Sequence, residues 1–133
     1  WLFTLARGEK FRLHTKRGFQ VGVEILVPSF FSKAKDPELV NIYKDLPIFF
    51  KKKPLQDGIH IQDVKLVDGT WRIAGDSGFV LVVTGSGTTV EEARNQAYLR
   101  IQSIMIQNMF YRTDIGLNWS VISDKLQTWG YLQ

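Results

Sequence analysis

Residues 78–116, GFVLVVTGSGTTVEEARNQAYLRIQSIMIQNMFYRTDIG, decide the fold. They predict a buried strand, a glycine turn, a capped helix and a compact polar loop, in that order. The run from Phe79 to Val83 is apolar at every position, which is typical of a strand that is covered on both faces and lies in the middle of a sheet. Thr89 suits the N-cap of the helix, and Glu92 three residues later completes a capping box.

The apolar spacing after Thr89 predicts a helix from Val90 to about Gln107. A stripe with an i, i+4 period faces the core in this interpretation. Its members are Ala93, Ala97, Ile101 and Met105. Because two of them are alanines, we expect the helix to approach a sheet closely.

The segments on the N-terminal side predict further strands. Residues 9–14 alternate over a short strand, and residues 19–27 alternate over a longer one that ends at Pro28. Residues 59–67 predict another strand, followed by an Asp68-Gly69 hairpin turn and a returning strand over residues 70–74.

The region between Ser29 and Asp57 gives weaker signals. Pro37 is a good first residue for a helix of about two turns. The apolar and basic segment between Pro47 and Pro54 predicts an edge strand. The length of 133 residues predicts a single domain over residues 1–133, and the sequence contains no internal repeat.

Composition excludes several classes of protein. The chain has no cysteine, so a disulfide framework and a thiolate metal site are impossible, and His14 and His60 are too few for a zinc site. The net charge is +4, but a short run such as residues 51–53 (KKK) is typically a solvated loop, so we expect no nucleic-acid partner. Since no apolar run reaches about 18 residues, we also expect no membrane partner and a cytoplasmic protein.

Two stretches are candidates for ligand binding. Gly85 and Gly87 lie between a strand and a helix start, where backbone N–H groups often hold phosphate. A tight structural turn is the favoured alternative, because Glu91 and Glu92 in the first helical turn would repel an anion. The second stretch holds Arg112, Asp114 and Gly116. Arginine suits an oxyanion and Asp114 can accept a hydrogen bond from a hydroxyl or an amine, but a self-contained loop with a local ion pair is the alternative.

The same stretches carry a resemblance to a known family. The matching residues are Val82-Val83-Thr84-Gly85-x-Gly87, Thr89 to Arg94 with Ala97-Tyr98, and Phe110-Tyr111-Arg112-x-Asp114-Ile115-Gly116. The chain resembles the C-terminal domain of the phosphoribosylamine–glycine ligase family. Thr113 departs from the family pattern, and the segment from Ser29 to Asp57 diverges from it.

The resemblance implies an α+β fold, with a small antiparallel sheet or half-barrel and one main helix packed on it. It also implies the C-terminal domain of an ATP-dependent ligase that joins glycine to 5-phosphoribosylamine in purine biosynthesis. In that family an upstream ATP-grasp domain holds ATP and Mg²⁺, so this domain closes the active site, supplies no catalytic residue and no metal ligand, and binds no cofactor alone.

In this resemblance Arg112, Asp114 and Gly116 are substrate-binding residues, and Gly85 and Gly87 form a ligand-facing loop. The chain begins with an apolar helical segment that ends at Gly8, which predicts that it is a fragment of a longer enzyme. The alternative is a stand-alone, non-catalytic binding or scaffold domain with the same fold.

Overall fold

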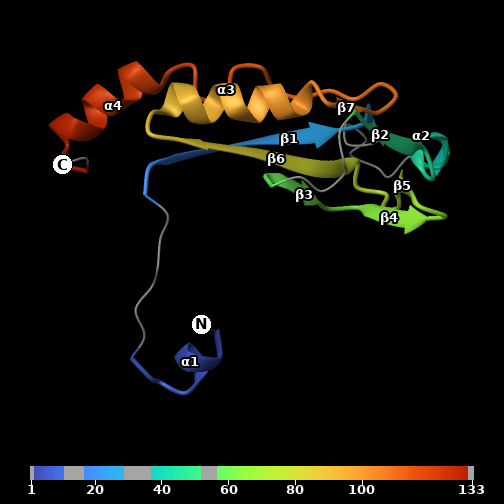
Figure 1. The fold of residues 1–133 in the computed structure, drawn as a ribbon, viewed down its shortest axis with the longest axis horizontal. Helices are drawn as coiled ribbons and strands as arrows, with labels where there is room; N and C mark the ends of the chain where they lie inside the picture. The colour runs from blue at the N-terminus through green and yellow to red at the C-terminus, as the bar shows by residue number, and fades with distance from the viewer. Residues whose placement is uncertain (1, 11–16, 29–36, 52–56, 132–133) are drawn as a thin grey trace.

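A computed structural model describes residues 2–10, 17–28, 37–51 and 57–131, and its core is built around strand β6 (Phe79–Gly87). This strand lies between β1 (Phe19–Leu26) and β3 (Ile59–Ile61) in a three-stranded antiparallel sheet (Figure 1). Val80, Leu81 and Val83 of β6 are fully buried. The prediction that the apolar run forms a central strand is therefore confirmed.

Helix α3 (Val90–Ile101) packs lengthwise on β6 and β1 (Figure 1). Ala93, Ala97 and Ile101 are fully buried in the contact. Gly85 makes the close approach possible, since a Cβ atom there would lie 2.0 Å from the Ala93 carbonyl oxygen and 2.5 Å from the Ala97 nitrogen. Small residues on both sides therefore set the distance between helix and sheet, and the α+β prediction is confirmed.

The start of α3 is capped as the sequence predicted, with one difference. The Thr89 hydroxyl accepts a hydrogen bond from the Glu92 N–H at 3.1 Å. The Glu92 carboxylate accepts from the backbone N–H of Thr88 at 2.7 Å and from its hydroxyl at 2.6 Å, one residue before the N-cap. These bonds satisfy donors that a helix start would otherwise leave without partners.

We expect Thr89→Ala to lower the free energy of unfolding by about 0.5–2 kcal/mol, because it removes the N-cap acceptor. Urea unfolding followed by far-UV circular dichroism measures the change. An unchanged midpoint would mean that the Glu92 contacts with Thr88 hold the helix start without Thr89.

Helix α3 ends at Ile101 and does not reach Gln107, so that prediction was wrong. The Ser103 N–H and hydroxyl both donate to the Arg100 carbonyl, which closes the last turn. Residues Ile104–Met105 form strand β7, which pairs with β2 (Pro47–Phe50). Strand pairing buries Ile104 and leaves Met105 48% exposed, so Met105 does not continue the buried helical stripe.

A second antiparallel sheet has the order β4-β5-β2-β7. Strands β4 (Val64–Val67) and β5 (Thr70–Ile73) are joined by the predicted two-residue turn, in which Asp68 and Gly69 have φ angles of 49° and 75°. Positive φ at both positions is what this turn requires. Strand β2 lies between β5 and β7, so the expectation of an edge strand there was wrong.

The single strand predicted over residues 59–67 is two strands in two different sheets. The Gln62 N–H donates to the Val80 carbonyl beside β6, whereas the Asp63 carbonyl accepts from the Ala74 N–H after β5. The chain therefore leaves the first sheet after β3 and enters the second sheet at β4.

The described residues form three further helices. Helix α2 (Pro37–Tyr43) begins at the predicted proline, and α1 (Leu2–Ala6) precedes Gly8, whose φ of 67° fits a helix end. Helix α4 (Trp119–Thr128) was not predicted. No helix within the described ranges is long and apolar enough to span a bilayer.

Some predictions fall on residues outside the described ranges. Residues 11–16, with most of the strand predicted over 9–14 and with His14, are among them. The others are residues 29–36 and 52–56, which hold much of the divergent segment and two of the three lysines in the run 51–53.

Candidate functional site

The polar loop over residues 110–116, which follows β7, lies against both β1 and α3. Leu26 and Phe110 exchange two backbone hydrogen bonds of 3.0 Å, which attach the start of the loop to the end of β1. At its other end Gly116 has a φ of 81°, and a Cβ atom there would lie 3.3 Å from a methyl group of Val90. A glycine therefore lets the chain turn close to the start of α3.

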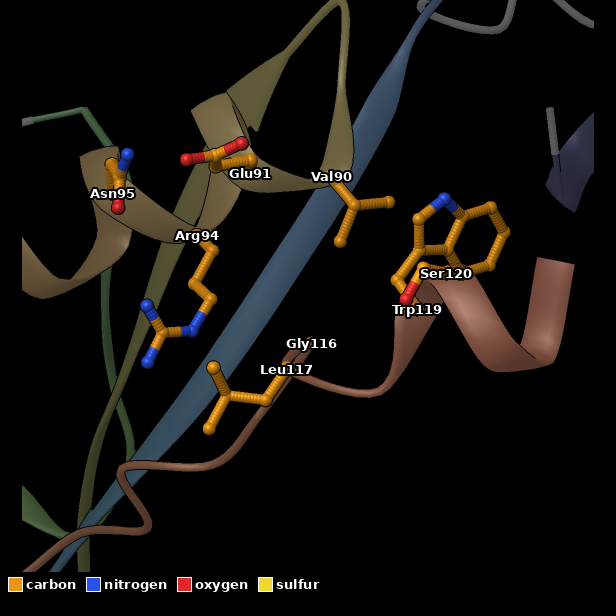
Figure 2. A pocket seen from close by; sticks show the side chains of 8 residues that line it. All are labelled: Val90, Glu91, Arg94, Asn95, Gly116, Leu117, Trp119 and Ser120. Atoms are coloured by element: carbon orange, nitrogen blue, oxygen red, sulfur yellow. The ribbon is translucent and has the colours of Figure 1, made fainter.

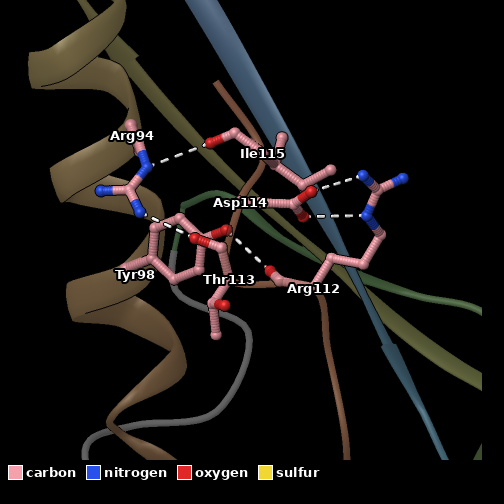
Figure 3. A network of polar contacts seen from close by, with 6 residues as sticks. All are labelled: Arg94, Tyr98, Arg112, Thr113, Asp114 and Ile115. Carbon is pink, nitrogen blue, oxygen red and sulfur yellow. Dashed lines mark hydrogen bonds and ion pairs between the residues drawn. The ribbon is translucent and has the colours of Figure 1, made fainter. Parts of the chain in front are cut away.

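Arg112 and Asp114 form an ion pair within this loop. The Arg112 Nε and Nη2 atoms donate to the two Asp114 carboxylate oxygens at 2.9 and 2.7 Å (Figure 3). Their side chains are 71% and 54% exposed. The third nitrogen of Arg112, Nη1, points away from Asp114 (Figure 3). Asp114 thus occupies the Nε–Nη2 edge of the guanidinium group. The outer edge, which carries Nη1, is directed away from Asp114.

The ion pair changes the acidity of both groups. Hydrogen bonding from Arg112 lowers the pKa of Asp114, and the same contact raises the pKa of Arg112. Asp114 is therefore ionised throughout the neutral range. Because the pKa of Asp114 is lower in the folded chain than in the unfolded chain, the ion pair contributes its full stability above the ordinary pKa of aspartate. That contribution is lost as the pH falls through the lowered pKa.

We expect a carboxyl-carbon NMR titration to give Asp114 a pKa below the ordinary aspartate value, and Arg112→Ala to raise that pKa towards the ordinary value, because the hydrogen bonds from Arg112 are the largest cause of the lowering. Asp45 is a matched control, because hydrogen bonding from Lys65 of β4 lowers its pKa. Its titration should stay the same in Arg112→Ala. An Asp114 titration that does not respond to Arg112→Ala would contradict the pairing.

Two side chains of α3 hold the backbone of the loop. Arg94 donates from Nε to the Ile115 carbonyl at 3.1 Å and from Nη2 to the Thr113 carbonyl at 2.8 Å (Figure 3). The Tyr98 hydroxyl donates to the Arg112 carbonyl at 2.7 Å. Arg94 and Tyr98 match the family pattern, but no role was predicted for them from the sequence. Their i, i+4 spacing, which places them on one helix face, was the available signal.

A hollow of about 300 Å³ lies beside the loop, between the start of α3 and the start of α4 (Figure 2). Arg94 and Gly116 contribute to its wall, together with Glu91, Trp119 and Ser120. Trp119 also makes an edge contact with the ring of Phe19, at 5.3 Å between ring centroids. The hollow thus shares Arg94 and Gly116 with the loop, whereas Arg112 and Asp114 do not line it.

Gly85 and Gly87 belong to β6, where they pair with Val21 and Phe19. The prediction that they form a glycine turn between the strand and the helix was therefore wrong. Their Cβ side faces α3, and a Cβ atom at Gly87 would lie 2.5 Å from the Glu92 Cβ. The neighbouring Ser86 N–H already donates to the Gln96 side chain at 2.8 Å. These contacts give both glycines a packing role, and their role in ligand binding stays a prediction.

Carboxylate and histidine side chains do not gather into a metal site among the described residues, where no group of three or more of them is close enough to hold an ion.

Comparison with known proteins gives one consistent result. The sequence model described as "Phosphoribosylglycinamide synthetase, C domain" matches residues 44–118. The chain is 39% identical over 54 residues to a phosphoribosylamine–glycine ligase of Caulobacter vibrioides, and 37% identical over 60 residues to that of Clostridium acetobutylicum. These matches cover 41% and 45% of this chain.

A solved structure has the same fold. The phosphoribosylamine–glycine ligase of Thermotoga maritima matches 85% of this chain with a TM-score of 0.64 and 28% sequence identity. The matches cover only 26% of that ligase, and 12% and 14% of the Caulobacter and Clostridium ligases. Since the family model matches more than half of the chain, the chain belongs to the family of phosphoribosylglycinamide synthetase C domains.

Proposed function

We propose that this chain is the C-terminal domain of an ATP-dependent ligase that joins glycine to 5-phosphoribosylamine in purine biosynthesis, and that it closes the active site of that enzyme. Membership of the C-domain family supports the proposal, together with the names of the relatives. Because the matched region is a small part of each relative, we assign the bond-forming chemistry to the remainder of the enzyme.

The orientation of Arg112 is the observation that carries the role of the loop. Asp114 occupies the Nε and Nη2 side of the guanidinium group, so an incoming oxyanion could use the outer edge with the ion pair intact. Arginine binds phosphate well because its planar fork matches two oxygens at once. A second ligand group, a sugar hydroxyl or an amine, suits the ionised Asp114 carboxylate. We propose that Arg112 and Asp114 bind the ribose-phosphate substrate and that Gly116 shapes the loop.

We place ATP and Mg²⁺ outside this domain, in an upstream ATP-grasp domain of the same polypeptide. Among the described residues, three or more carboxylate and histidine side chains do not come together in a group that could hold a metal ion. In this assignment the domain contributes binding and orientation of substrate only.

The experiment compares the 133-residue chain with the longer protein that contains it, each supplied with ATP, glycine and phosphoribosylamine. We expect the longer protein to ligate them, and the 133-residue chain alone to give no product. Ligation by the chain alone would contradict the assignment of chemistry to the upstream domain. Absence of ligation by a folded longer protein would favour the competing function, a non-catalytic binding or scaffold domain.

A further inference from the structure

We infer that Arg94 is a positioning residue. It fixes the backbone of residues 112–116 in the polar loop, so that the side chains of Arg112 and Asp114 keep one orientation relative to the domain. This inference rests on the proposed function for its consequence in catalysis, but its structural part can be tested without any substrate. Arg94 lies on α3 and contacts the loop from a rigid element, whereas Arg112 and Asp114 are exposed and pair with each other.

Four consecutive backbone carbonyls of the loop accept hydrogen bonds. Arg94 donates to those of Thr113 and Ile115, on either side of Asp114. Tyr98 donates to the carbonyl of Arg112, and the Leu117 N–H donates to that of Asp114 at 3.1 Å. Two side chains of one helix therefore hold three of these four peptide groups.

Arg94 is itself held in place. Its guanidinium carbon lies 4.6 Å from the centre of the Tyr98 ring, one helical turn further along α3. A cation over an aromatic face is an attractive contact, and it keeps Arg94 beside the residue that holds the Arg112 carbonyl. The two carbonyls accept from two different nitrogens of one planar group, an arrangement that the single ammonium of lysine does not reproduce.

The orientation of the exposed ion pair depends on this support. Arg112 and Asp114 are only two residues apart, so their mutual hydrogen bonds do not connect the loop to the rest of the domain. A loop released from α3 would carry the pair with it in many directions. Pre-organisation of a binding group by a rigid support is what raises affinity in such sites.

The test replaces Arg94 and a matched arginine of the same helix. Arg100 is also partly buried, and its Nη1 donates to the Thr84 carbonyl at 2.6 Å and to Gln96 at 2.8 Å, away from the loop. In the 133-residue chain, we expect Arg94→Lys to speed amide exchange of Leu117 by about tenfold or more, as loss of charge-assisted bonds implies. We expect Arg100→Lys to leave the Leu117 exchange rate unchanged.

Tyr98→Phe is the second variant, because it removes only the hydroxyl that donates to Arg112 and keeps the ring. It should also speed exchange at Leu117, by a smaller factor than Arg94→Lys. If exchange in both variants equals that of the unmodified chain, or if Arg100→Lys speeds it as much as Arg94→Lys, the positioning role is wrong.

The functional consequence is measured in the longer ligase. We expect Arg94→Lys to raise the KM for phosphoribosylamine about tenfold while the KM for ATP stays the same, which a general loss of stability would not do. An unchanged KM for phosphoribosylamine, with faster Leu117 exchange, would overturn the functional part of the inference. An Arg112→Ala enzyme with normal kinetics would instead overturn the proposed substrate site, and the exchange result would stand.

Discussion

Gly85→Ala is expected to lower the free energy of unfolding by about 3 kcal/mol, at the upper end of what overpacking costs. The added methyl group would lie 2.0 Å from the Ala93 carbonyl oxygen and 2.5 Å from the Ala97 nitrogen. Both are backbone atoms of α3 and do not move independently of the helix. The change must therefore push α3 away from β6 and loosen its contact with the sheet.

Gly22→Ala is a matched control on the neighbouring strand β1. Its Cβ atom would meet methyl groups of Val82 and Thr84 at 3.8 and 3.9 Å, which is ordinary van der Waals contact. We expect its free energy of unfolding to stay within about 1 kcal/mol of the unmodified chain, since alanine fits there and restricts the unfolded chain. Equal urea midpoints for the two variants would contradict the close approach of α3.

Ile104→Ala is expected to lower the free energy of unfolding by about 2–5 kcal/mol, the range for truncating a buried isoleucine side chain to Cβ. Ile104 is 2% exposed and lies opposite Phe50 in the pairing of β2 with β7. A cavity there weakens both the core and the short strand that ends the second sheet. Thermal and urea unfolding give the magnitude.

Met105→Ala is the control for the position next to it. Met105 is 48% exposed, so its truncation should change the free energy of unfolding by no more than about 0.5 kcal/mol. If Met105→Ala lowered the free energy of unfolding more than Ile104→Ala did, the result would instead support the helical stripe that was predicted to continue past Ile101.

The sequence predicted the elements whose signals are local. The continuous apolar run identified β6, and alternation identified β1. The start of α3 followed from Thr89 and Glu92, because a cap is a contact between residues three apart. Asp68 and Gly69 identified the hairpin for the same reason, since the turn depends on φ angles of those two residues alone.

The elements that were predicted wrongly depend on distant partners. Ile101 and Met105 fit a helical spacing, and the end of α3 becomes visible only when Phe50 is found opposite Ile104. Likewise, residues 59–67 form two strands because Gln62 bonds beside β6 and Asp63 bonds beside β5. The pairings of Phe50 with Ile104 and of Gln62 with Val80 join segments that other elements separate in the chain, and neither segment carries a periodic pattern that reveals its partner.

The candidate site divides in the same way. Arg112 and Asp114 could be selected from side-chain chemistry, and their spacing allowed the local ion pair that the structure contains. Arg94 and Tyr98 could not be assigned, because their partners are backbone carbonyls, which every residue carries, in a loop 14 to 21 positions along the chain.

We propose that Arg112 contacts the phosphorylated substrate, and this contact is tested by the KM for phosphoribosylamine in the Arg112→Ala ligase. Loss of charge-assisted hydrogen bonds predicts a rise of about tenfold to a hundredfold. The KM of the Arg112→Lys ligase should lie between those of the unmodified and the Arg112→Ala ligases, because lysine keeps the positive charge but lacks the planar fork of donors. An unchanged KM, or activity that falls only in step with the melting temperature, would contradict the proposed contact and give the loop a structural role only.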